Sequence, residues 1–126
     1  MLNLLYISLG GALGALARYS LSLGLASKSM NFPTATLCTN IVGCFLMGMI
    51  TEIFTLKANL PSELKLLIAT GFLGAFTTFS TFGLESVSLI NKAEFGKCFV
   101  YMTSSVVFGV SAIFAAVWLT RNILAR

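Results

Sequence analysis

The sequence predicts an all-α membrane protein with four transmembrane helices, and three observations support this prediction. The chain has 126 residues, of which 57% are hydrophobic and only 10% charged, with a mean hydropathy of +0.94. A soluble domain has about 25% charged residues, so this chain lacks the polar surface that a soluble core would need. The apolar residues gather in four stretches, each close to the ~20 residues that a spanning helix requires. Short connections join them, so we expect one four-helix domain over residues 1–126.

The four apolar stretches differ in how they are interrupted. The first contains Arg18 within its apolar run. No basic residue precedes this run, so we do not expect it to be a cleaved signal peptide. The second has Glu52 near its end, whereas the third is free of charge as far as Leu84 and the fourth is free of charge throughout. Pro33 and Pro61 lie in the connections, as is typical of turns. The expected spans are residues 4–25, 34–56, 66–90 and 99–120.

The composition excludes several classes of protein. There is no His and no Asp, so a Ser-His-Asp triad or a His-based metal site cannot form, and we expect no enzyme. Eight Lys and Arg residues stand against four Glu and are scattered singly, which is too sparse for a nucleic-acid interface. The odd number of cysteines and the absence of a CxxC motif argue against a disulfide framework or a zinc site. Cys38 and Cys44 lie in an apolar run, where Cys behaves as a small hydrophobe.

Basic residues are almost equally distributed between the two ends of the predicted helices. One side has four and the other three, a difference of 4 − 3 = 1, and Arg18 would remove even that difference. Because orientation follows the Lys/Arg bias, so small a difference points towards insertion both ways and an antiparallel homodimer, without fixing either. The alternative is that a small bias, or another determinant, fixes one orientation. The two sets are Lys57, Lys65, Arg121 and Arg126, against Lys28, Lys92 and Lys97.

The third span carries the densest polar cluster, between Gly71 and Gly83. Four hydroxyl side chains occur within the five residues 77–81, interleaved with phenylalanines. Gly and consecutive Ser/Thr allow a membrane helix to open and to expose backbone carbonyls, which are cation ligands. We therefore expect the third helix to be broken near mid-membrane. The alternative is that the hydroxyls bond back to their own helix and the glycines only permit close packing.

Four further positions are candidates for function. Phe79 and Phe82 are three residues apart, near one helix face, and a ring edge is positive enough to contact an anion. Asn40 can donate to an anion, or it can form an interhelical hydrogen bond. Arg18 lies within the first span, where we expect it to pair with Glu85; direct contact with a substrate is the alternative. The fourth span also contains several hydroxyls, which could line a polar track or bond back to the helix.

The chain resembles the Fluc fluoride channels of the CrcB family from end to end, and three motifs carry this resemblance. Residues 10–19 (GGALGALARY) are similar to the family's opening motif, and residues 36–43 (TLCTNIVG) to its second. Ala35 stands where that second motif usually has Gly. Residues 71–82 (GFLGAFTTFSTF), followed by Glu85, match the third-helix signature.

The resemblance implies a dual-topology homodimer in the bacterial inner membrane, with two fluoride pores. It implies passive export of fluoride, which protects the cell, and a structural sodium ion on the dimer axis. Backbone carbonyls of Gly74 and Thr77 from each subunit would hold that ion, which is not itself transported. The implied pathway residues are Asn40, Phe79, Phe82, Ser80, Thr81 and Glu85, with Ser111 as the expected serine of the fourth helix.

Two other functions stay open at the level of the sequence. A small dual-topology, proton-coupled multidrug exporter needs a carboxylate deep in a span, but the first span has none. Glu52 and Glu85 lie towards helix ends. The third possibility is a structural subunit of a larger membrane complex, which would transport nothing by itself.

Overall fold

The computed structural model describes residues 1–26 and 32–124. Within these ranges the protein is all-helical, and four passages are long and apolar enough to cross a membrane, which confirms the predicted class. Lys28 and Arg126, which entered the charge comparison, lie outside the described residues. The first, second and fourth passages are α1 (Leu2–Ala26), α2 (Thr34–Leu56) and α6 (Phe95–Leu124). The third consists of α3 (Ser62–Lys65), the π-helix η1 (Leu66–Leu73), α4 (Gly74–Phe76) and α5 (Phe79–Asn91).

The third and fourth passages each begin four residues before the expected boundary, at Ser62 rather than 66 and at Phe95 rather than 99. The prediction started each span where the charged residues end. The helices instead continue through Glu63, Lys65 and Lys97, because the helical backbone does not require an apolar side chain at its ends.

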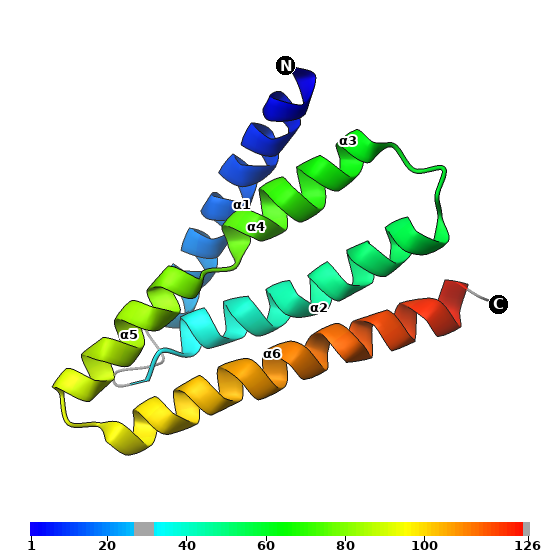
Figure 1. Ribbon diagram of the computed structural model, residues 1–126. Coiled ribbons are helices and arrows are strands. Elements are labelled where there is room, and N and C mark those ends of the chain that lie inside the picture. Colours follow the sequence, from blue (N-terminus) through cyan, green and yellow to red (C-terminus); the bar gives the residue numbers. More distant parts are fainter. Residues whose placement is uncertain (27–31, 125–126) are drawn as a thin grey trace.

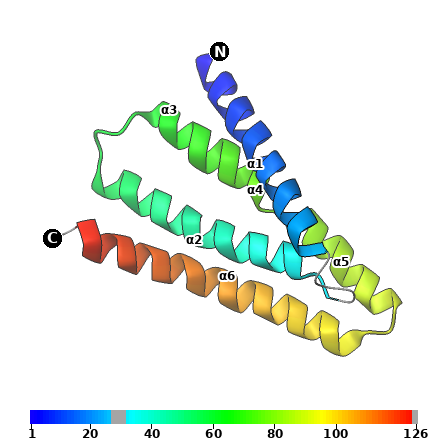
Figure 2. The ribbon, with the colours of Figure 1, turned by 180° about the vertical axis from the view of Figure 1, so that it is seen from behind.

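Two pairs of passages make up the molecule (Figure 1). α2 and α6 lie side by side and run in the same direction, while α1 crosses the third passage at η1 and α4; Figure 2 shows the same arrangement from behind. The start of α1, the α2–α3 connection and the end of α6 lie towards one end of the molecule, and the α5–α6 turn lies at the other. These helix ends and the two connections named here are therefore on the sides that four consecutive spans require.

Glycines allow α1 to pack directly on the backbone of η1. A Cβ added at Gly10 would overlap the carbonyl oxygen of Leu67, and one added at Gly14 would overlap that of Phe72. Gly71 meets α1 from the other side, because a Cβ there would lie 2.7 Å from the carbonyl oxygen of Ile7. Small residues that let two backbones approach are typical of helix pairs in membranes. The opening GGALGA motif thus supplies the contact surface for the third passage.

The α2–α6 pair is held by close packing and by one ion pair. A Cβ added at Gly48 would lie 2.8 Å from the carbonyl oxygen of Ile113, so the two helices are almost in backbone contact. One turn further along α2, the buried carboxylate of Glu52 accepts a hydrogen bond from Nε of Arg121 at 2.9 Å. A buried carboxylate requires such a partner, since leaving it unpaired is strongly destabilising.

The helical path of the third passage is interrupted by two extended residues. α4 ends at Phe76, Thr77 has ψ 157°, Thr78 has φ −151° and ψ 117°, and α5 begins at Phe79. The last hydrogen bond before the interruption runs from N–H of Thr77 to the carbonyl of Leu73, at 3.1 Å. The helix then restarts with Thr78 as its N-cap, since its Oγ1 accepts from N–H of Thr81 at 3.2 Å.

Close packing at Gly14 predicts a large effect of one methyl group. Gly14→Ala should destabilise the protein by about 1–3 kcal/mol, because the new Cβ would overlap a backbone atom that no rotamer change can move. Gly11→Ala is the matched control, since nothing lies within 4 Å of a Cβ added there. The measurement is the thermal unfolding of both variants in detergent, and equal unfolding temperatures would contradict the packing.

Candidate functional site

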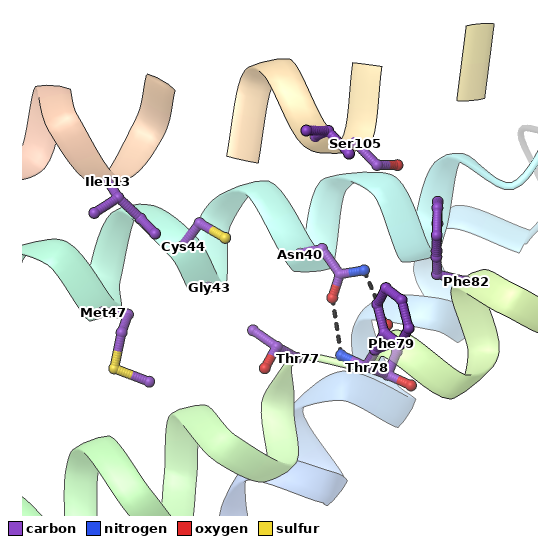
Figure 3. Close-up of a pocket in the computed structure, with 11 residues that line it drawn as sticks. Asn40, Gly43, Cys44, Met47, Thr77, Thr78, Phe79, Phe82, Ser105 and Ile113 are labelled. Carbon is purple, nitrogen blue, oxygen red and sulfur yellow. Dashed lines mark hydrogen bonds between the residues drawn. The ribbon is translucent and has the colours of Figure 1, made fainter. Parts of the chain in front are cut away.

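A pocket of about 300 Å³ lies beside the interruption of the third passage (Figure 3). α2, α5, α6 and the two extended residues contribute its walls, so three of the four passages meet there. The polar part of the wall consists of Asn40, Thr77, Thr78 and Ser105. The remainder is Gly43, Cys44, Met47, Phe79, Phe82, Val106 and Ile113.

Asn40 of α2 bonds to both backbone groups of Thr78. Its Nδ2 donates to the carbonyl of Thr78 at 3.0 Å, and its Oδ1 accepts from N–H of Thr78 at 2.8 Å. The two bonds appear as dashed lines in Figure 3. An amide supplies one donor and one acceptor side by side, which is what an extended residue lacking helical partners needs. The structure therefore contains the interhelical hydrogen bond that the sequence left as one of two alternatives, while Asn40 also lines the pocket.

Thr78 is the centre of the polar network, and sequence reasoning had not distinguished it from its neighbours. Its side chain donates to Oγ1 of Thr81 at 2.9 Å and lies 3.5 Å from Oγ of Ser80. Thr78 is almost completely buried, with 8% of its surface exposed. Ser80 and Thr81 therefore support the interrupted segment through Thr78, whereas neither of them lines the pocket.

Two phenylalanine rings form the wall of the pocket at the start of α5. The ring centroids of Phe79 and Phe82 are 5.5 Å apart with an interplanar angle of 34°, and Phe82 also contacts the ring of Tyr101 at 5.2 Å. Phe79 is 84% exposed in the single chain. Both rings lie where the sequence predicted them, near one face of the helix and beside the polar groups.

Glu85 has different partners from the predicted one. Its Oε1 accepts from Oγ1 of Thr36 at 2.8 Å and its Oε2 accepts from Oη of Tyr101 at 2.7 Å. The carboxylate thus faces α2 and α6, and the expected pair with Arg18 of α1 is wrong. Among the described residues Arg18 forms no ion pair. Glu85 does not line the pocket itself. It is connected to the pocket residue Phe82 through Tyr101, which is completely buried and contacts the ring of Phe82.

Ser105 is the serine of α6 that lines the pocket, whereas Ser111 is exposed and does not line it. Six residues of an α-helix rotate a side chain by about 240°, so the two serines face different directions. The structure thus brings Ser105 and not Ser111 to this pocket, and the pathway role expected of Ser111 stays a prediction. The packed face of α6 contains the buried residues Cys98, Tyr101 and Gly109. Ser105 lies on the same face, between Tyr101 and Gly109 at helical spacing.

Two backbone carbonyls beside the pocket lose their helical donors. In a continuous α-helix the Gly74 carbonyl would accept from N–H of Thr78, but that group donates to Asn40. The Thr77 carbonyl would accept from N–H of Thr81, which instead donates to Oγ1 of Thr78. Backbone oxygens suit a hard cation, so these residues fit a small monovalent ion. No cluster of three or more His, Cys, Asp or Glu side chains occurs in the described part of the chain.

Four apolar passages, three of which meet at a largely apolar pocket beside an interrupted helix, define a small multi-pass membrane protein. The chain belongs to the CrcB family: residues 5–117 match the family described as "CrcB-like protein, Camphor Resistance (CrcB)". This match confirms the resemblance read from the sequence motifs.

Curated relatives are similar over nearly their whole length. The chain is 43% identical over 120 residues to "Fluoride-specific ion channel FluC" of Saccharophagus degradans, covering 95% of this chain and 90% of the relative. It is 39% identical over 124 residues to the protein of the same name from Agrobacterium fabrum, covering 98% and 99%. It is 44% identical over 113 residues to "Fluoride-specific ion channel FluC 1" of Bacillus cereus, covering 87% and 82%.

The Glu85 contacts predict that Tyr101 stabilises the helix arrangement through its hydroxyl. Tyr101→Phe should lower the stability by about 1–3 kcal/mol, because one oxygen of the half-buried Glu85 carboxylate loses its donor. Thermal unfolding of Tyr101→Phe, Thr36→Val and the double variant provides the measurement. The two changes should be non-additive, since both donors serve one carboxylate. Strict additivity would show that the carboxylate does not couple them.

Proposed function

We propose that this chain is a fluoride-selective anion channel that lets fluoride leave the cell passively and so lowers its cytoplasmic concentration. The observation that carries the proposal is the pocket at the interrupted helix, where an amide and two phenylalanine rings meet without a carboxylate in the described wall. The names of the curated relatives supply the identity of the anion. We place the protein in the bacterial inner membrane, because it has four helices that can span a membrane and because its relatives are bacterial proteins.

The groups in the pocket suit a small anion that loses water as it passes. The Asn40 amide has two N–H groups, of which one is bonded to Thr78, so the other is left for the pocket. Phe79 and Phe82 offer ring edges, which carry partial positive charge. The hydroxyl of Ser105 donates to the carbonyl of Tyr101 at 2.7 Å and therefore offers no proton to an anion. Asn40 and the two rings are thus the principal anion contacts.

An antiparallel homodimer completes the proposal. Gly74 is exposed, and Phe79, at the start of α5, is 84% exposed. If the interruption lies at mid-membrane depth, freed carbonyls at this face would meet hydrocarbon, where each unsatisfied polar group costs several kcal/mol. A second copy in the opposite orientation would cover this face, and the near balance of basic residues supports that orientation.

A structural sodium ion fits between the two copies. The carbonyls of Gly74 and Thr77 from each subunit would hold it, since both have lost their helical donors. Its positive charge would satisfy those oxygens and favour anions in the adjacent pockets, because the local dielectric constant is low.

A proton-coupled exporter receives less support from the geometry. Such an exporter needs a free carboxylate in the transport site. Glu85 is bonded to Thr36 and Tyr101, and Glu52 is paired with Arg121. A structural subunit remains the outcome if the purified protein transports nothing.

The function is tested by fluoride efflux from liposomes that contain the purified protein. A channel should release fluoride when a potassium ionophore clamps the voltage and no proton gradient is present. Drug transport that requires a proton gradient would identify an exporter instead. The absence of both kinds of transport would instead indicate a structural subunit of a larger membrane complex.

The two rings predict a specific loss of flux. Phe79→Ile and Phe82→Ile should each slow fluoride efflux about tenfold, which corresponds to a barrier raised by ~1.4 kcal/mol when ring-edge contacts are lost. Phe99→Ile is the control, because Phe99 is exposed on α6 and does not line the pocket. Wild-type flux in both pocket variants would remove the rings from the pathway.

Dual topology predicts that a tag at the C-terminus is found on both faces of the membrane. The reason is the four-versus-three distribution of basic residues between the two sides. Protease accessibility of the tag in sealed inverted and right-side-out vesicles measures the distribution. Adding two or three Lys residues to one side should move all tags to one face. Tags of the unaltered protein on a single face would refute the antiparallel form.

The sodium ion predicts that activity depends on the cation in the buffer. Exchange of sodium for a large organic cation should abolish fluoride efflux, because the carbonyls at the dimer axis would lose their common ligand. Thr77→Ser should retain the dependence, since the ligand is a backbone atom, whereas Gly74→Val should abolish efflux. Full efflux after rigorous sodium removal, or a sodium current alongside fluoride, would contradict a static ion.

A further inference from the structure

We infer that Asn40 and Gly43 are positioning residues: together they aim the Thr77 carbonyl and so set how tightly the interrupted segment holds its cation. This inference rests on the cation site of the proposed function. Asn40 and Gly43 are three residues apart on α2, on the face that meets the interruption. Neither of them contributes a ligand to the proposed cation site itself.

The first observation concerns a single peptide unit. The carbonyl of Thr77 and the N–H of Thr78 belong to the same peptide bond, which is planar and trans among the described residues. In such a unit the C=O and the N–H point in opposite directions. Oδ1 of Asn40 accepts from that N–H at 2.8 Å and fixes its direction. The Thr77 carbonyl must therefore point away from Asn40.

The second bond of Asn40 prevents this peptide from rotating about the chain. Nδ2 donates to the carbonyl of Thr78 at 3.0 Å, so both polar groups of Thr78 are held by one rigid amide. The amide orientation is determined by its partners, because the N–H of Thr78 requires an acceptor and its carbonyl requires a donor. Rotation of Asn40 would break both bonds and leave two backbone groups unpaired.

The third observation is the contact at Gly43. A Cβ added there would overlap Cγ2 of Thr77 and lie 3.3 Å from Cδ1 of Phe76. Thr77 is therefore pressed directly against α2, and only glycine leaves room for its methyl group. Asn40 fixes the direction of the Thr77–Thr78 peptide and Gly43 fixes its distance from α2.

The same amide connects the anion pocket with the cation site. One N–H of Asn40 is bonded to Thr78 and the other is left for the pocket, so an anion at Asn40 and a cation at Thr77 share one rigid group. Coupling between two binding sites is reciprocal. A change that loosens Asn40 should therefore weaken cation binding, even though Asn40 does not touch the cation.

The test measures sodium affinity without using transport. Purified protein in detergent is titrated with sodium, with a large organic cation holding the ionic strength constant, and the midpoint of the rise in unfolding temperature is recorded. Asn40→Asp keeps the acceptor for the N–H of Thr78 but places a carboxylate oxygen against its carbonyl. We expect the affinity for sodium to fall about tenfold or more.

A matched variant separates geometry from charge. Cys44→Asp introduces the same carboxylate into the same pocket, where Cys44 makes no hydrogen bond to the interrupted segment. A negative charge near the site can only attract sodium, so this variant should leave the affinity unchanged or raise it. Charge and positioning thus predict opposite signs for Asn40→Asp.

An uncharged pair of variants provides an independent arm with a rescue. Gly43→Ala should weaken sodium binding to a similar extent, because its methyl group displaces Thr77. Adding Thr77→Ser removes the Cγ2 atom with which that methyl group collides, while the backbone carbonyl stays in place. The double variant should regain sodium affinity to within about threefold of Thr77→Ser alone, a non-additivity expected only of residues in contact.

The outcomes distinguish this inference from the proposed function. Unchanged or increased sodium affinity in Asn40→Asp, or a Gly43→Ala defect that Thr77→Ser does not relieve, overturns the positioning role while the channel and its ion stand. A wild-type protein whose unfolding temperature ignores sodium overturns both the cation site and this inference, and fluoride efflux then tests the channel separately.

Discussion

The pair of hydrogen bonds between the Asn40 amide and the backbone of Thr78 is the interaction on which the site depends. A helix that opens inside a membrane releases N–H and carbonyl groups that water cannot reach, so another part of the protein must satisfy them. Asn40 does this for Thr78 at 3.0 and 2.8 Å, and Thr78 in turn caps α5 through its side chain. The direction of α5, and with it the position of Phe79 and Phe82, follows from this one contact.

The rest of the molecule provides a framework in which that contact can form. Hydrocarbon offers no hydrophobic drive for helices to associate, so close packing and polar contacts must hold them together. Gly10 and Gly14 bring α1 onto η1, and Gly48 brings α6 onto α2. The Glu52–Arg121 pair and the donors on Glu85 add polar contacts between passages. α2 is thereby held against α6, which leaves its opposite face for the interruption.

Hydropathy predicted the four passages because the length of an apolar run is a local property of the chain. The run of hydroxyl and glycine residues likewise located the polar cluster between Gly71 and Gly83, within which the extended residues lie. The direction in which a side chain points around the helix axis could not be predicted from spacing in one helix, because it depends on the neighbouring helices. Glu85 lies in the middle of α5 rather than towards a helix end, and its partners are not the predicted one. On α6, Ser105 and not Ser111 shares the packed face beside the pocket. The partner of Asn40 is a contact across 38 residues, which no local pattern encodes.

The glycines of this fold fall into two groups with different evolutionary freedom. Gly10, Gly14 and Gly48 face backbone atoms of the neighbouring helix, and a backbone atom cannot be made smaller by changing another residue. Gly43 faces the side chain of Thr77, which a substitution can shorten. The first group should therefore resist change in any lineage that keeps this helix arrangement. Positions 43 and 77 can instead drift as a pair, so that a larger residue at one is accompanied by a smaller residue at the other.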